Sequence, residues 1–145
     1  MKTNTARLSK LTIITKLSSA YKVWHGYLES LPRPSRYTLG VKIDNLFVEL
    51  TELLLTASYS TQKSKTSILQ TAGHKLDLLK FFLQVLWELE LLDNKKYIGL
   101  SSQLEEVGWM LGGWHRQVRE QTQNSPRIRL RHPPTGGGGL RMGEK

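Results

Sequence analysis

The segment "LDLLKFFLQVLWELELL", residues 76–92, decides the fold. Twelve of its seventeen residues are apolar, and four of the five polar ones recur every three or four positions, at Asp77, Lys80, Gln84 and Glu88. This is the period of an α-helix whose polar side chains form one narrow stripe. A helix that is apolar around most of its circumference must be buried on more than one side.

Two apolar rows run along this helix. The first is expected in the core of the chain's own bundle and contains Leu69, Ala72, Leu76, Leu79, Leu83 and Leu86. The second is expected to meet another copy of the chain and contains Leu78, Phe81, Phe82, Val85, Leu89 and Leu92. A wide core face with some ordinary exposed apolar residues is the alternative interpretation.

Three further segments have the same period. Their apolar positions are Leu8, Leu11, Ile14, Leu17, Tyr21, Trp24 and Leu28; then Leu39, Ile43, Leu46, Leu50, Leu53 and Ala57; and then Leu100, Leu104, Val107, Leu111, Trp114 and Val118. The prolines at 32 and 34 interrupt the first connection. Capping residues are expected at Ser60, Thr61 or Ser64, and near Ser101 or Ser102. The sequence therefore predicts an all-α, antiparallel up-down four-helix bundle over residues 1–121, followed by a flexible basic Gly- and Pro-containing tail at 122–145.

Three glycines interrupt the last helix, in "EEVGWMLGGWHRQ" at residues 105–117. A glycine in a helix interior costs ~1 kcal/mol relative to alanine, so a close neighbour is expected. On a helical wheel Gly108 and Gly112 lie beside the core stripe, while Gly113 and Trp109 face outward. We expect Gly108, Trp109 and Gly112 to join the second apolar row in self-association.

The formal charge of +9 suggests an acidic partner, nucleic acid or an anionic membrane surface. Residues 1–42 hold eight Lys and Arg against one acid, residues 43–121 eight against ten, and residues 122–145 five against one. The basic N-terminal stretch resembles a transit peptide, but its apolar stripe continues without a break, so we interpret it as the first helix. Its lysines are scattered around that helix, which makes a membrane-surface role the weaker interpretation. No membrane span is predicted, and the absence of cysteine fits a cytoplasmic protein.

Catalytic and metal-binding patterns are not found in the sequence. The four histidines lie in separate segments without ligand spacing, and "TGGGGLR" in the tail lacks the lysine and helix of a phosphate-binding loop. We therefore expect no enzyme activity, no cofactor and no metal site. The basic side chains are then the remaining candidates for a functional site. They lie on the first helix and its loop, at the third connection and late in the last helix. In an up-down bundle Arg33, Arg36, Lys95 and Lys96 share one end, where they could bind phosphates without reading sequence.

The segments "RYTLG" at 36–40, "LDLLKFFL" at 76–83 and "MLGGW" at 110–114 resemble the accessory variability determinant family of diversity-generating retroelements. The resemblance runs from about Tyr21 to Trp114. That family belongs with four-helix proteins encoded in intervening sequences of large ribosomal RNA genes. It implies a homopentameric barrel that binds a reverse transcriptase and template RNA or cDNA, and that supports mutagenic retrohoming.

The resemblance also narrows the set of candidate nucleic-acid contacts. The family often carries a basic residue at the position of Trp109, which implies that other cations of this chain make these contacts. Nucleic-acid contacts are then expected at Lys16, Lys22, Arg33, Arg36, Lys80, Lys95, Lys96, Arg116 and Arg119. The competing hypothesis is an oligomeric protein–protein scaffold, like the ribosomal intervening-sequence proteins, without nucleic-acid binding.

Overall fold

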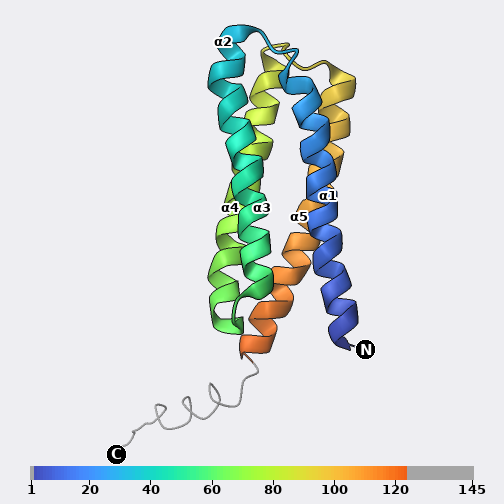
Figure 1. The fold of residues 1–145 in the computed structure, drawn as a ribbon, viewed down its shortest axis with the longest axis vertical. Coiled ribbons are helices and arrows are strands. Elements are labelled where there is room, and N and C mark those ends of the chain that lie inside the picture. The colour runs from blue at the N-terminus through green and yellow to red at the C-terminus, as the bar shows by residue number, and fades with distance from the viewer. Residues whose placement is uncertain (1, 124–145) are drawn as a thin grey trace, which may run out of the picture.

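A computed structural model describes the backbone of residues 2–123 and the side chains of residues 10–122, and within this part it contains helices and no strand. Four long helices run up and down in antiparallel order (Figure 1). They are α1 (Lys2–Leu28), α3 (Val41–Tyr59), α4 (Gln62–Glu88) and α5 (Asn94–Gln123), with the short α2 (Arg33–Ser35) and the π-helix η1 (Arg36–Gly40) between α1 and α3. The predicted four-helix bundle is confirmed. The tail expected beyond residue 123 lies outside the described residues.

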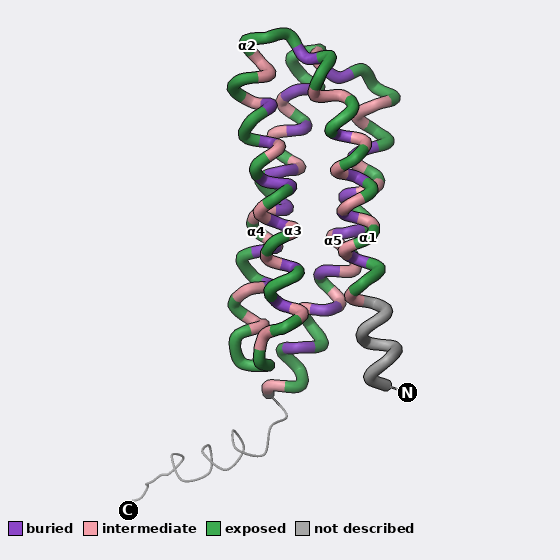
Figure 2. The backbone as a smooth tube through the Cα atoms, viewed as in Figure 1, coloured by how far each residue is buried: buried purple, intermediate pink, exposed green. Residues whose placement is uncertain are grey.

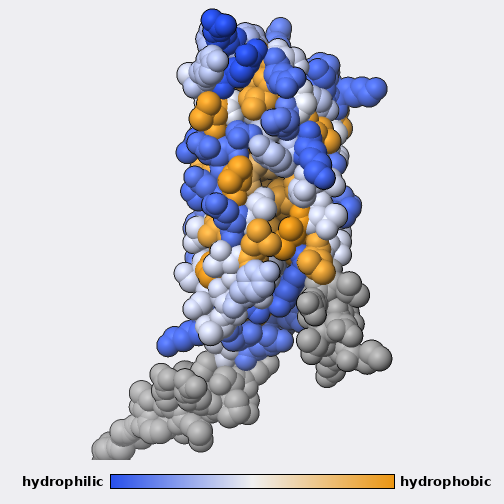
Figure 3. All heavy atoms as spheres, viewed as in Figure 1, coloured by the Kyte–Doolittle hydropathy of each residue, from blue (hydrophilic) through white to orange (hydrophobic). Residues whose placement is uncertain are grey.

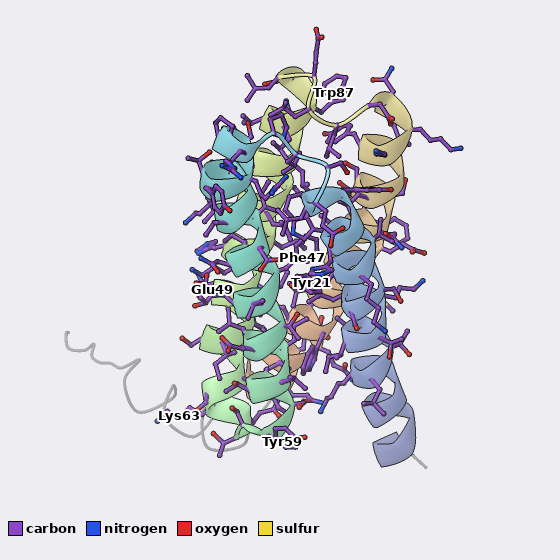
Figure 4. The ribbon with its side chains drawn as sticks, turned by 45° about the horizontal axis from the view of Figure 1, so that its top comes forward. Tyr21, Phe47, Glu49, Tyr59, Lys63 and Trp87 are labelled. Carbon is purple, nitrogen blue, oxygen red and sulfur yellow. The ribbon has the colours of Figure 1, made fainter. Side chains whose placement is uncertain are left out.

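The helices form a ring in the order α1, α3, α4, α5, in which each packs mainly against its two neighbours. Their buried residues face the centre along the whole length of the bundle (Figure 2). Between α1 and α3, Tyr21 and Phe47 point toward each other with ring centres 5.6 Å apart (Figure 4). Trp24 stacks on the same Phe47 and donates its Nε1 proton to Asp44 at 3.3 Å. The core therefore stabilises the bundle by apolar burial, and the indole N–H of the buried Trp24 is satisfied at the edge.

The predicted core rows are confirmed throughout α4 and α5, where all twelve positions are buried. They are partly wrong in α1, because Leu11 is 52% exposed and Ile13 is buried in its place. In α3 the predicted core residue Leu53 is half-buried, and its neighbour Leu54 is buried instead. Both errors occur where neighbouring apolar residues allow two stripes about 100° apart on the helix.

The connection from α1 to α3 is more helical than the prolines suggest. Helix α2 starts directly after Pro32, and Pro34 lies in its first turn, where a missing N–H leaves no hydrogen bond unmade. The π turn η1 then brings Gly40 against α1. A Cβ atom at Gly40 would lie 2.8 Å from a methyl carbon of Leu28 and 3.3 Å from the carbonyl oxygen of Ser35. The "RYTLG" motif therefore makes a close approach between the end of α1 and the start of α3.

The other helix ends are capped by side chains and by backbone geometry. Thr61 caps α4 by accepting a hydrogen bond from the Ser64 N–H, as one of the three predicted caps. Asp93 caps α5 by accepting from the Lys96 N–H at 2.8 Å, so the start predicted near Ser101 or Ser102 was seven residues late. Helix α4 ends with the N–H of Leu91 bonded to the carbonyl of Leu86, around a Glu90 with φ of 63°. This turn buries Leu92, which is 3% exposed and belongs to the core instead of the predicted second row.

Candidate nucleic-acid interface

The first and third connections lie at the same end of the bundle, as the up-down topology predicts (Figure 1). We call this the loop end and define it by residues 29–36 and 88–96. Arg33 and Lys95 are exposed there. The four predicted cations of this end therefore do come together, but only these two are free of internal contacts among the described residues.

Arg36 and Lys96 have structural partners. The Arg36 guanidinium donates from Nη2 to the carbonyl oxygens of Glu29 at 3.1 Å and Leu31 at 3.0 Å. These carbonyls belong to the connection that follows α1, so Arg36 fixes the backbone of that connection. The Lys96 ammonium lies over the Tyr27 ring, 5.2 Å from its centre. Both cations hold the connection together and are less available to a ligand.

Acidic residues offset the charge of the loop end. Residues 29–36 and 88–96 contain four cations and also four acids, which are Glu29, Glu88, Glu90 and Asp93. Opposite charges this close cancel much of the field seen by a distant polyanion. The loop end is therefore a weaker attractor of nucleic acid than its arginines and lysines suggest.

Two further predicted cations form ion pairs across helices. Lys16 of α1 lies 3.2 Å from Glu106 of α5, and Lys80 of α4 lies 3.2 Å from Glu105 of α5. Adjacent glutamates thus reach opposite flanks of α5. Exposed pairs of this kind stabilise a protein by only about 0–1 kcal/mol, but each removes one uncompensated positive charge from the surface.

The opposite end of the bundle has the larger charge excess. We call it the turn end and define it by residues 58–67 and 114–123, which hold Lys63, Lys65, Arg116 and Arg119 against the single acid Glu120. Figure 4 places Lys63 and Tyr59 here, far from Trp87 at the loop end. The face seen in Figure 3 is hydrophilic at both ends, with apolar side chains around the boundary of α1 and α3. Only Arg116 and Arg119 of this cluster belong to the predicted set.

His115 lies beside these cations on α5. Burial lowers its pKa from the ordinary value of 6.5, and the charge of Arg119 lowers it further. The imidazole is therefore neutral at physiological pH. The four cations and the one acid of the turn end therefore carry its electrostatics.

Gly108, Gly112 and Gly113 of α5 have different surroundings. A Cβ atom at Gly108 would lie 3.4 Å from a methyl carbon of Leu76, so α4 packs closely there. An added Cβ atom at Gly112 or Gly113 would have nothing within 4 Å. Gly112 lines an open groove between α4 and α5, together with Gly73 and Gly108. The exposed Trp109, at 86%, forms the rim of this groove. The glycines therefore clear a surface channel as well as permitting helix packing.

The predicted subunit-contact residues fall on more than one surface. Phe81 is 55% exposed and lines the groove region near Lys80 and Glu105. Leu78 is 42% exposed, while Phe82 and Val85 are half-buried, and none of these three lines the groove. The apolar row and the Trp109 face thus flank different sides of α4.

A comparison with protein families matches residues 11–118 to the bAvd-like family. The match spans about three quarters of the chain and takes in parts of all four long helices. The chain belongs to the bAvd-like family. This confirms the resemblance inferred from "RYTLG", "LDLLKFFL" and "MLGGW". A search of curated proteins finds no significant match.

The bAvd-like chain also carries basic residues that the sequence prediction did not include. Lys63 and Lys65 lie in the first turn of α4, and Lys10 of α1 places its Nζ atom 5.6 Å from the centre of the Trp114 ring on α5. The sequence contained a signal for these lysines, because two basic residues in the first turn of a helix go against the usual preference for acidic residues there. Lys22 of the predicted set is exposed on α1.

No group of His, Cys, Asp or Glu in residues with described placement could hold a metal ion. Within the same residues of this bAvd-like chain, no helix is both long enough and apolar enough to cross a bilayer.

Proposed function

We propose that this chain is a non-catalytic accessory protein of a diversity-generating retroelement, acting in the cytoplasm. It binds the reverse transcriptase and contacts template RNA or cDNA through Lys and Arg, and so supports mutagenic retrohoming. The family match over residues 11–118 carries this proposal. The charge excess of the turn end supports it, since phosphate contacts need uncompensated cations.

Within the predicted set, the exposed cations Lys22, Arg33, Lys95, Arg116 and Arg119 are the ones we propose as phosphate contacts. Lys16 and Lys80 can contribute by exchanging their glutamate partners for phosphate, because exposed pairs are weak. No base-reading motif accompanies them, so recognition is of the backbone and does not depend on sequence.

We further propose that the chain assembles as a homopentamer. Leu78, Phe81, Phe82, Val85, Gly108, Trp109 and Gly112 are the proposed contacts. The exposed Trp109 and the separate row of apolar side chains on α4 support this assembly, because large exposed apolar side chains are unfavourable on a monomer.

Light scattering behind a sizing column, with and without RNA over a salt series, tests the proposal. We expect a five-subunit mass, co-migration with RNA that decreases as salt rises, and co-purification with the reverse transcriptase. The pair Arg116→Gln and Arg119→Gln is expected to weaken RNA binding by about tenfold. The control pair Lys42→Gln and Lys75→Gln removes the same charge elsewhere and is expected to change it by about twofold or less.

A pentamer that ignores RNA at low salt would overturn the nucleic-acid function. The protein–protein scaffold would then be the better description, and the balanced charge of the loop end would agree with it. A monomer would overturn the assembly.

A further inference from the structure

One side of α3 carries a row of apolar side chains that the bundle leaves exposed. Of the twelve large hydrophobic side chains that are exposed in the described part of the chain, five lie on η1 and α3. All of them are at least 41% exposed, and they are Tyr37, Val41, Val48, Leu55 and Tyr59. Figure 4 shows Tyr59 at the turn end of α3, so the row runs along the whole helix.

These five residues share one side of the helix, because they are separated by four or seven positions. Asp44 and Glu52 fill the two gaps of seven positions and lie on the same side. The core residues Leu46 and Leu50 are buried on the other side of α3. We call the exposed side the α3 face. It is an apolar stripe that contains two acids and no cation.

The charge of α3 is opposite to that of the whole chain. The helix contains Asp44, Glu49 and Glu52 against Lys42, whereas the chain has a formal charge of +9. Glu49 pairs with Lys75 of α4 at 3.1 Å. Glu52 is exposed and forms no ion pair with the side chains that the structure describes. RNA is a polyanion and is repelled by such a face, whereas a cationic segment of a protein is attracted.

We propose that the α3 face binds an amphipathic helix of a partner protein, with lysine or arginine among the apolar side chains of that helix. This inference rests on the proposed function, in which the partner is the reverse transcriptase. Amphipathic helices are recognised through apolar residues three and four positions apart, and neighbouring charges select the partner. Asp44 and Glu52 are eight positions apart, about 12 Å along the helix, so they fit two basic residues about two turns apart.

The α3 face stays available in the proposed assembly, because the subunit contacts proposed above lie on α4 and α5. The apolar row begins at Tyr37, directly after the loop end. A polymerase bound to this row would therefore reach the nearly neutral end of the bundle.

Surface plasmon resonance with immobilised reverse transcriptase tests the α3 face. Leu55→Asn removes an apolar contact without adding charge, and we expect it to weaken binding by about tenfold. Glu52→Gln removes one charge at the edge of the contact. We expect it to weaken binding by about threefold and to reduce the salt dependence of the affinity.

Leu11→Asn is the matched control, because it makes the same substitution at an exposed leucine of α1, outside the α3 face. We expect it to change the affinity by about twofold or less. Equal losses in Leu11→Asn and Leu55→Asn would overturn the inference. A change of subunit mass in Leu55→Asn would also overturn it, by assigning the α3 face to a second copy of the chain.

A synthetic peptide separates this inference from the proposed function. The probe is an amphipathic helix of about 18 residues, with leucine at every third or fourth position and lysine elsewhere on the same side. If the reverse transcriptase binds the wild type and Leu55→Asn equally, the α3 face is overturned and the function stands. If the polymerase does not bind at all but the peptide binds Leu55→Asn about tenfold more weakly than the wild type, the polymerase partnership fails and the docking face stands. If the peptide shows no such difference either, both are overturned.

Discussion

Gly40 is the residue at which the α1–α3 connection depends most directly on side-chain size. A Cβ atom there would press on Leu28 and on the Ser35 carbonyl, with Leu31 3.5 Å away. We expect Gly40→Ala to lower the free energy of unfolding by about 1 kcal/mol, because overpacking outweighs the better helix propensity of alanine. Urea unfolding at fixed protein concentration measures the change.

Gly26 supplies the control for this substitution. It lies in α1, is exposed, and has nothing within 4 Å of an added Cβ atom. Gly26→Ala should therefore stabilise the protein by ~1 kcal/mol. Equal stabilisation by both alanine substitutions would show that the approach at Gly40 can relax without loss.

Arg36 shows what the sequence could not reveal about single residues. Its place in a basic loop predicted a phosphate contact, but its guanidinium is engaged by two carbonyls at the end of α1. Lys16 and Glu106 are ninety positions apart and pair only because α1 and α5 are neighbours. Charge counts along a sequence give the residues but not their partners, since partners depend on tertiary packing.

At the scale of single helices, the end of α4 contains one residue in an unfavourable backbone conformation. Glu90 adopts a left-handed conformation, which costs a residue with a Cβ atom roughly 1–2 kcal/mol relative to glycine. We expect Glu90→Gly to raise the free energy of unfolding by about 1 kcal/mol, measured by urea unfolding. Glu90→Gln removes the charge and keeps the backbone conformation. If the two variants gain equally, the benefit comes from charge and the backbone explanation is wrong.

The helices themselves were predictable to different degrees. Every core position of α4 and α5 followed from periodicity, because each core row repeats every three or four residues along the helix. In α1, Leu11, Ile13 and Ile14 offer competing stripes, and the packing of α3 and α5 selects Ile13. The early start at Arg33 and the π turn were missed because two prolines normally mark a break.

At the scale of the whole molecule, the proposed subunit contact can be tested with two equally exposed residues. Leu78 on α4 and Val48 on α3 are both 42% exposed, but only Leu78 belongs to the proposed contact. We expect Leu78→Glu to raise the subunit dissociation constant at least about tenfold, because a charge would be buried there without a partner. Val48→Glu should leave the mass unchanged in light scattering. Dissociation by Val48→Glu alone would move the contact to α3.

The sequence predicted the basic character of the candidate site better than it predicted which side chains lie together. The basic composition and the up-down topology correctly brought the four loop-end cations together. The balancing acids were visible in the sequence, but the ion pairs of Lys16 with Glu106 and of Lys80 with Glu105 were not, since each pair joins residues on different helices. The contact of Lys10 with the Trp114 ring likewise depends on how α1 packs against α5.

The unequal charge of the two ends makes the molecule an electric dipole along its long axis. The loop end is close to neutral and the turn end is positive. In the field of a polyanion such a rod experiences a torque before any contact forms, and it approaches with the turn end first. If every subunit of the proposed ring points the same way, these dipoles add, and the assembly has one cationic face and one that is nearly neutral. RNA and polymerase could then occupy opposite faces without competing for the same residues.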